Sequence, residues 1–353
     1  MTIRPVLVAV FLLSAAALSY EVLLMRLFSI IQWHHFAYMV IGLALLGYGI
    51  SGAIVSIFQQ TLQRHFFPVF ITAIILFAVT SAGAFLIAQQ IPFNAEEILW
   101  DNRQLWFLCG LFLLLSVPFF FAATAICIAF LYYQKDTARI YAADLVGAGM
   151  GSVGVILLLF WLFPQQALVG IVTVSLLAAL AASYPLTRKS RLMAIVVIAV
   201  LLSGFLLGAE FIQLKISPYK SQQQVMQITG ARVVAQRSSP LGLLSVVENN
   251  TVPFRYAPGL SLNARNEPPP QKALFTDGDG MTVINQFQDD IQQLAFLDYL
   301  PSALPFHLQK LPSVLLVGGG GGSDILQSLY HEVSAIDVLE MNPQVIELVN
   351  DTF

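Results

Sequence analysis

Five consecutive glycines near the end of the chain, Gly318–Gly322, stand between a strand-like run and a helix-like run. Val314–Val317 has the composition of a buried parallel strand, and the residues from Asp324 onward have a helical spacing of apolar side chains. Glycines let a backbone approach a charged or bulky ligand, and the N–H groups at the start of a helix point toward it. A second strand-like run ends at Glu340, whose carboxylate is placed to accept hydrogen bonds from ribose hydroxyls. The sequence therefore predicts a nucleotide site made of Gly318, Gly319, Gly320, Gly321, Gly322 and Glu340.

A glycine run alone could also be a flexible linker. Here a strand precedes the glycines, and a helix, a second strand and an acid follow them, which favours a nucleotide site. The dinucleotide-binding pattern calls for a small residue where Ser323 stands, so the pattern is only roughly met. The motif alone does not distinguish NAD from S-adenosylmethionine.

The first part of the chain is too apolar for an ordinary soluble protein. The chain is 57% hydrophobic and 10% charged, whereas soluble domains carry about 25% charged residues. Seven apolar runs are long enough to cross about 30 Å of hydrocarbon as helices: 5–31, 36–58, 67–89, 105–133, 140–163, 166–186 and 192–212. We therefore predict a transmembrane helical domain over residues 1–212, lying in the cell membrane (the plasma or inner membrane).

The charges between the predicted spans oppose the location expected for a nucleotide-binding domain. Seven basic residues fall on one side of the membrane: Arg4, Arg64, Lys135, Arg139, Arg188, Lys189 and Arg191. The positive-inside rule places that side in the cytoplasm, and seven spans then place the soluble part outside. If the nucleotide comes from the cytosol, however, the soluble part must lie in the cytoplasm. One span fewer would reconcile the two, and the first run has the look of a signal peptide, although it stays apolar through Ile31, which favours a retained span.

Charged residues stand out within the apolar runs, among them Glu21, Arg26 and Asp144. Charges inside a bilayer are costly and are usually functional. On one helix Glu21 and Arg26 point about 140° apart, so they do not form a good pair, and Arg26 can instead extend to the interface. We expect these residues to be intramembrane polar sites.

Gly147 and Gly151 form a GxxxG pattern in the fifth predicted span. Small residues at this spacing let two helices approach closely. The pattern predicts a tight helix contact at this face, which could also join copies of the chain into an oligomer. The bilayer is the main partner that we expect, and nothing in the sequence indicates a nucleic-acid partner.

After residue 212 we predict two further parts. Residues 213–300 form a small β-rich unit, with turns at Ser239–Gly242 and Asp277–Gly280 between strand-prone runs. Residues 290–305 have a helical spacing of apolar side chains that Pro305 ends. Residues 301–353 form the beginning of a Rossmann-like α/β domain that is apparently truncated, with Asn342 as a helix cap. We predict no metal site.

Residues 314–348 resemble the adenosyl-binding strand, loop and second strand of the spermidine synthase family of aminopropyltransferases. The run "TDGDGMTVIN" resembles the family's preceding hairpin, and "SYEVLLMRL" and "YAADLVGAGMGSVG" resemble its membrane-fused, multi-span relatives. The resemblance implies a methyltransferase-like fold that takes S-adenosylmethionine or its decarboxylated form as substrate. It also implies transfer of an aminopropyl or alkyl group to an amine or to a membrane substrate, as in polyamine biosynthesis.

The chain departs from the family at several positions. The family's loop aspartate is replaced by Gly321, its last glycine by Ser323, and the glutamine after its hairpin by Met281. Its Tyr-His-Glu stretch falls near Leu297, Asp298 and Tyr299. The family's catalytic aspartate lies on a later strand, so we assign no catalytic residue. The alternative prediction is a polytopic transporter or sensor whose nucleotide domain is regulatory or inactive.

Overall fold

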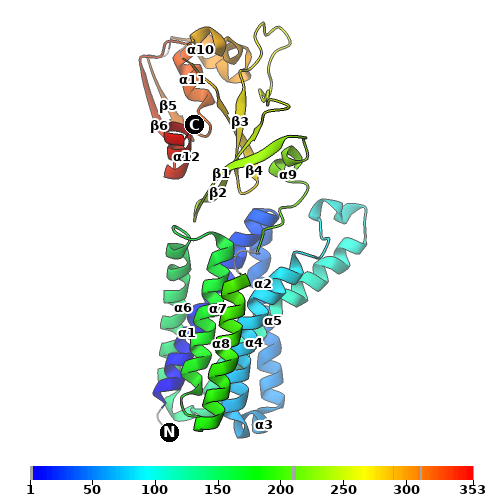
Figure 1. Ribbon diagram of the computed structural model, residues 1–353, viewed down its shortest axis with the longest axis vertical. Helices are drawn as coiled ribbons and strands as arrows, with labels where there is room; N and C mark the ends of the chain where they lie inside the picture. The colour runs from blue at the N-terminus through cyan, green and yellow to red at the C-terminus, as the bar shows by residue number, and fades with distance from the viewer. Residues whose placement is uncertain (1–2, 209–211, 289, 311, 353) are drawn as a thin grey trace. The chain divides into compact units, whose positions relative to one another are not determined.

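The computed structural model describes residues 3–208, 212–288, 290–310 and 312–352, and it divides into two compact units, Met1–Lys215 and Ile216–Phe353. Within the described residues, the first unit is helical and the second contains the strands (Figure 1). The division lies close to the change of composition near residue 212.

Seven helices of the first unit are long and apolar enough to cross a membrane. They are α1 (Arg4–Ile31), α2 (His34–Ile57), α4 (Phe66–Ala88), α5 (Arg103–Tyr132), α6 (Thr137–Leu158), α7 (Pro164–Ser183) and α8 (Arg188–Gly208). They match the seven predicted spans, except that residues 209–211 of the last span lie outside the described residues. The predicted multi-pass helical membrane region is confirmed at this level.

Short helices connect some of the spans: α3 (Gln59–Arg64), η1 (Ala95–Leu99) and η2 (Gln134–Asp136). The longest span, α5, has 30 residues and contains Pro118, whose ring cannot continue the helix hydrogen bonds. Figure 1 shows the beginning of α5 leaning out from the other helices, with η1 before it.

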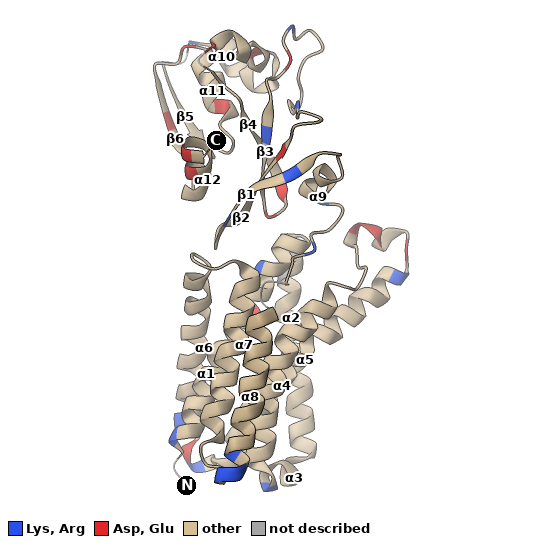
Figure 2. Ribbon diagram, viewed as in Figure 1, with Lys and Arg blue, Asp and Glu red and all other residues tan. Residues whose placement is uncertain are grey.

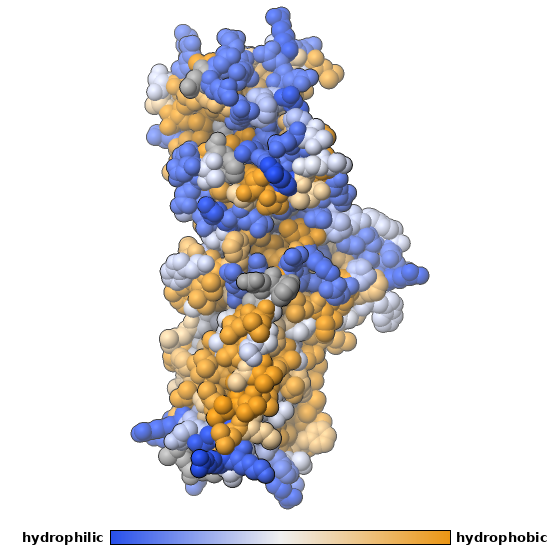
Figure 3. All heavy atoms as spheres, in the orientation of Figure 1, coloured by the Kyte–Doolittle hydropathy of each residue, from blue (hydrophilic) through white to orange (hydrophobic). Residues whose placement is uncertain are grey.

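The outer surface of the helices is apolar. On α8, the side chains of Val196, Val200 and Leu207 are 60%, 63% and 77% exposed, and Figure 3 shows apolar side chains over much of the helical unit. The Lys, Arg, Asp and Glu residues gather mostly at the ends of the helices (Figure 2). Apolar side chains of this kind are stable against lipid. The helices also satisfy their backbone hydrogen bonds internally, which a segment in lipid requires.

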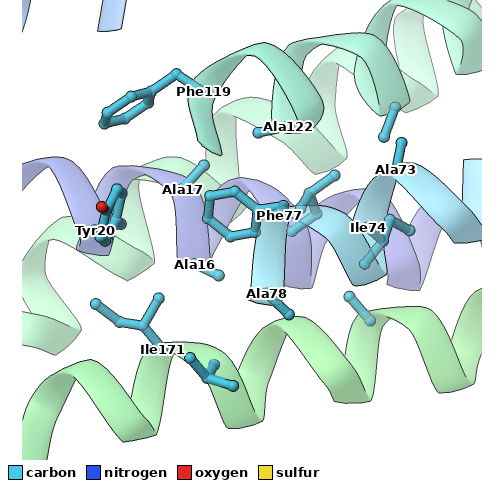
Figure 4. Packing of buried hydrophobic residues seen from close by; sticks show 14 of the residues in the cluster. Ala16, Ala17, Tyr20, Ala73, Ile74, Phe77, Ala78, Phe119, Ala122 and Ile171 are labelled. Carbon is cyan, nitrogen blue, oxygen red and sulfur yellow. The ribbon is translucent and has the colours of Figure 1, made fainter. Parts of the chain in front are cut away.

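A core of aromatic and small side chains holds the helices together (Figure 4). Tyr20 of α1 is fully buried and contacts Phe77 of α4 edge-on and Phe119 of α5 at ring-centroid distances of 6.2 and 5.4 Å. Lipid tails are as apolar as this core, so close packing rather than water exclusion stabilises it. Alanines such as Ala16 and Ala78 supply the close approach between neighbouring helices.

The predicted GxxxG contact forms between α6 and α1. Gly147 and Gly151 are buried, and a Cβ atom at either position would meet the backbone of Phe11 or Ala15. The hydroxyl of Ser19 donates to the carbonyl oxygen of Gly151 at 2.8 Å. Within one chain, α1 covers this face of α6. Association of several chains through the face remains a prediction.

The second unit begins with a four-stranded antiparallel sheet in the order β1-β2-β3-β4. Its strands are β1 (Ala231–Ser239), β2 (Gly242–Asn249), β3 (Gln271–Thr276) and β4 (Asp279–Asn285), with α9 (Ser221–Met226) before them. Asp277 and Gly278 have φ values of +54° and +74°, which is the left-handed backbone that a tight hairpin turn requires. Both predicted hairpins are confirmed.

The predicted single helix over residues 290–305 is wrong in type. The chain there forms the 3-10 helices η4 (Ile291–Tyr299) and η5 (Pro301–Ala303), followed by α10 (Leu304–Leu308). Leu300 has an extended backbone, with ψ 152°, because the proline ring after it disfavours the helical region. The proline thus divides the segment that the apolar spacing alone would join.

The last part of the unit contains two parallel strands, β5 (Ser313–Val317) and β6 (Ala335–Leu339), joined through α11 (Ser323–Tyr330). After β6 come α12 (Pro343–Glu347) and the π-helix η6 (Leu348–Thr352). The Asn342 side chain accepts a hydrogen bond from the backbone N–H of Gln344, and Pro343 stands at the first helical position. The predicted cap is confirmed.

Candidate functional site

The glycine run forms a tight loop between β5 and α11. Gly318, Gly320 and Gly322 have φ values of +91°, +48° and +86°. Residues that carry a Cβ atom rarely adopt this backbone region. The Gly318 N–H donates to the Leu339 carbonyl oxygen at 2.8 Å, which joins the start of the loop to the end of β6. The alternation of left-handed residues explains why this loop is built from glycine.

The structure brings Glu340 onto the loop. The Glu340 Oε2 atom accepts hydrogen bonds from the N–H groups of Gly319 and Gly320 at 3.0 and 3.3 Å. Its Oε1 atom accepts from the Asn342 N–H at 2.9 Å. The carboxylate is therefore fixed at the end of β6 against the loop, which is where an acid that recognises ribose hydroxyls stands in nucleotide-binding units.

The loop also packs closely against strand β4. A Cβ atom at Gly321 would meet the carbonyl oxygen of Val283, and one at Gly320 would lie 3.1 Å from Cγ2 of Thr282. The Gly321 backbone thus occupies the space that any side chain at this position would need.

A cavity of about 400 Å³ lies beside the loop. It is lined by Gly318–Gly321, by Met281 and Thr282 of β4, and by Leu297 and Pro301 of η4 and η5. This volume falls within the range of about 300–1,000 Å³ typical of small-molecule sites. Met281 and Leu297 thus form part of the cavity wall.

A buried polar network in the wall of the cavity was not predicted from the sequence. The Gln271 side chain donates to Asn285 Oδ1 at 2.9 Å and to the Tyr256 carbonyl oxygen at 3.1 Å, and it accepts from the Tyr256 N–H at 2.6 Å. Asn285 donates in turn to the hydroxyl of Ser323, the first residue of α11, at 2.9 Å. The network joins the ends of β3 and β4 to the helix that follows the glycine loop.

The three predicted intramembrane polar residues, Glu21, Arg26 and Asp144, have different surroundings in the structure. Asp144 of α6 accepts a hydrogen bond from Ser14 of α1 at 2.5 Å, and both residues line a cavity of about 330 Å³ together with Tyr48 and Cys127. Glu21 and Arg26 are half-buried on α1, and Arg26 donates to Ser29 at 3.0 Å. Asp144 has therefore found a partner across a helix interface.

Among the described residues, those named in the sequence analysis lie at two candidate sites, one in each unit. The first is the glycine loop with Glu340 and its cavity, and the second is the Asp144 cavity among the helices. Comparison of the chain with protein-family models, with curated proteins and with solved structures finds no match, so the residues described above stand by themselves.

Proposed function

We propose that this multi-pass membrane protein binds an adenosyl compound and acts as a transferase of the spermidine synthase type. The substrate would be S-adenosylmethionine or its decarboxylated form, and the acceptor an amine or a membrane substrate. The observation that carries the proposal is the Glu340 carboxylate held on the N–H groups of Gly319 and Gly320, beside a cavity of about 400 Å³. This arrangement is also what supports the Rossmann-like character of residues 301–353.

The chemistry of such a transfer is a displacement at carbon. The acceptor nitrogen forms a bond to the carbon attached to the positively charged sulfur, and the carbon–sulfur bond breaks with its electron pair going to sulfur. The nitrogen then loses a proton. The residues of this chain would bind and orient the donor: Glu340 would accept ribose hydroxyls, and Met281 and Leu297 would form an apolar wall that excludes water.

Gly321 bears on the choice between the two donors. In the spermidine synthase family an aspartate at this position contacts the amine-bearing tail of the donor, and here that carboxylate is replaced by a glycine. We therefore propose no strong preference for the decarboxylated form.

Calorimetric titration of the full chain in detergent tests the proposal with S-adenosylmethionine, its decarboxylated form and NAD. Glu340→Ala removes charge-assisted hydrogen bonds worth roughly 1.5–3 kcal/mol, so affinity should fall about tenfold or more. Gly320→Val should reduce affinity further, because Gly320 has a φ of +48° and lies against Thr282. Glu347→Ala is the matched control, since Glu347 is an exposed carboxylate on α12, and it should bind as the unaltered chain does.

Two results would contradict the proposal in different ways. If no adenosyl compound binds, the glycine run is a packing turn and the transferase proposal fails. If only the decarboxylated form binds, and an aminopropyl group is transferred to putrescine, the transferase proposal stands and the inference from Gly321 fails.

A second proposal, a transporter or a sensor with a regulatory nucleotide unit, is favoured by the Asp144 cavity. Ionisable residues inside helical bundles commonly mark ion or substrate pathways. In sealed proteoliposomes, Asp144→Asn should abolish a proton flux measured with an internal pH-sensitive dye, whereas Asp136→Asn, at the end of η2 where Asp136 pairs with Arg139, should not. Equal and negligible flux for all three proteins would remove this proposal.

A further inference from the structure

Three side chains that the nucleotide site does not use converge on one another in the second unit. Asp298 lies in η4, His307 in α10, and His331 follows the last residue of α11. One ligand-type atom of each lies within 4.8 Å of the other two. The His307 Nε2 atom lies 2.7 Å from Asp298 Oδ1, and the His331 Nε2 atom lies 3.3 Å from the same oxygen.

Packing, and not only the hydrogen bonds of the cluster, sets these positions. The Gln327 side chain of α11 donates to the Leu297 carbonyl oxygen at 2.6 Å, next to Asp298 in the chain. The Phe306 ring stacks on the His331 ring, with centroids 4.5 Å apart and an angle of 5° between the planes. The three side chains therefore come from elements that are already fixed against each other.

The His331 ring is the least exposed of the three. Its side chain is 15% exposed, compared with 27% for Asp298 and 55% for His307. Its Nε2 atom is buried and has no hydrogen-bond partner of good geometry among the described residues. A buried nitrogen without a partner is costly unless something binds it.

We propose that Asp298, His307 and His331 form a binding site for a divalent transition-metal ion of the Zn²⁺ class. Two imidazoles and one carboxylate are ligands that Zn²⁺ accepts, with a water molecule in the fourth position. Bonds of about 2.0 Å in a tetrahedron separate ligand atoms by about 3.3 Å, close to the separation of His331 Nε2 and Asp298 Oδ1. Ca²⁺ and Mg²⁺ prefer sites built from oxygen ligands alone, so this set of ligands disfavours them.

The ion would connect three elements around the adenosyl site. It would tie the end of α11, which starts at the glycine loop, to η4 and α10, and Leu297 of η4 lines the cavity. Binding of a metal ion to the folded state alone stabilises it. The proposal concerns ligands outside the glycine loop, so it stands whether or not the loop binds an adenosyl compound.

The test is a calorimetric titration of the full chain, in detergent and without a polyhistidine tag, with Zn²⁺ after treatment with a chelator. We expect one Zn²⁺ per chain and a melting temperature that rises with Zn²⁺ concentration. His307→Ala and Asp298→Asn each remove a direct ligand, so affinity should fall by more than the roughly 10–100-fold that loss of an outer-shell partner causes. His307 is half-exposed, so its replacement should leave the fold intact, which circular dichroism would verify.

His65→Ala is the matched control, because His65 is an exposed histidine of the helical unit, and this variant should keep the full affinity and stoichiometry. Mg²⁺ should give no heat of binding at the site. Absence of one-to-one Zn²⁺ binding to the unaltered chain would overturn the proposal, and so would unchanged affinity in folded His307→Ala and Asp298→Asn proteins. The cluster would then be a set of hydrogen-bonded side chains without a metal ion.

Discussion

At the scale of single residues, Gly321 shows how closely the glycine loop is fitted to its surroundings. We predict that Gly321→Asp, which introduces the aspartate found at this position in the spermidine synthase family that the sequence resembles, destabilises the second unit instead of improving its affinity for a donor. The new Cβ atom would meet the Val283 carbonyl oxygen, and a backbone atom cannot move aside as a flexible side chain can. Overpacking of this kind typically costs about 1–3 kcal/mol, which chemical denaturation of the second unit would measure.

Gly280→Asp is the matched control for this prediction. Gly280 lies in the same hairpin and has a φ of +56°, but a Cβ atom there would meet no described atom within 4 Å. Its cost should be limited to that of a left-handed backbone, roughly 1–2 kcal/mol at most, because aspartate tolerates this region better than most residues. If Gly321→Asp is as stable as Gly280→Asp and binds the decarboxylated donor more tightly, the steric argument is wrong.

At the scale of elements, the contact of α6 with α1 makes a clear prediction. Gly151→Leu should lower the thermal stability of the chain in detergent, because a Cβ atom at Gly151 would lie 2.6 Å from the Cα atom of Ala15. A helix pair that packs backbone against backbone cannot accept a large side chain without separating. The separation would also stretch the hydrogen bond between Ser14 and Asp144.

Gly149→Leu supplies the control within the same helix. Gly149 lies two residues before Gly151, is exposed, and has no described neighbour within 4 Å of a Cβ atom. A leucine there would face lipid and should leave the melting temperature almost unchanged. Equal melting temperatures for the two variants would show that the α6–α1 contact contributes little to stability.

The sequence predicted those elements whose signals are local. The seven spans, the Asp277–Gly278 turn and the Asn342 cap depend on residues that are neighbours in the chain, and each forms as expected. The network of Gln271 and Asn285 was not predictable in this way. The hairpin pairs Thr276 with Asp279, so counting outward from the turn would pair Gln271 with Ile284, but a bulge between Leu274 and Thr276 shifts the register to Asn285.

The residues of the candidate sites likewise differ in whether local sequence could predict them. Glycines with positive φ values and an acid at the end of the second strand follow from a known pattern of spacing, so Gly318–Gly322 and Glu340 could be named in advance. The convergence of Asp298, His307 and His331 could not, because local spacing does not specify how η4 and α10 pack against the end of α11, where His331 lies. Nor could the sequence tell which helix would cover Gly151, since spacing within a span does not specify its partner.

At the scale of the whole molecule, two physical arguments disagree about orientation in the membrane. The basic residues Arg4, Arg64 and Arg188 stand at helix ends on one side of the bundle, and seven spans place the end of α8 on the other. The positive-inside rule puts the basic side in the cytoplasm, whereas a donor made in the cytosol requires the second unit there. We predict that the need for the donor prevails and that the second unit is cytoplasmic.

Cysteine labelling in intact cells decides between the two orientations. Cys109 and Cys127 would first be replaced by alanine, and single cysteines would then be introduced at exposed Thr137 and exposed Asn263 in turn. A membrane-impermeant thiol reagent should label the Thr137→Cys protein from outside and should leave the Asn263→Cys protein unlabelled until the cells are opened. The reverse pattern would place the second unit outside and would remove the cytosolic donor from the proposed function.

The hydrogen bonds of Glu340 have a consequence for how a ligand would enter. A carboxylate has about four positions at which it can accept a hydrogen bond, and Gly319, Gly320 and Asn342 already use three of them. A ribose that offers two hydroxyls must therefore displace at least one loop amide from the carboxylate. Arrival of the donor would be an exchange of partners instead of a simple addition, with the released amide free to turn toward the ligand. Deuterium uptake at Gly319 and Gly320 would then be slow in the ligand-free protein already, and binding would redistribute that protection between the two amides instead of creating it.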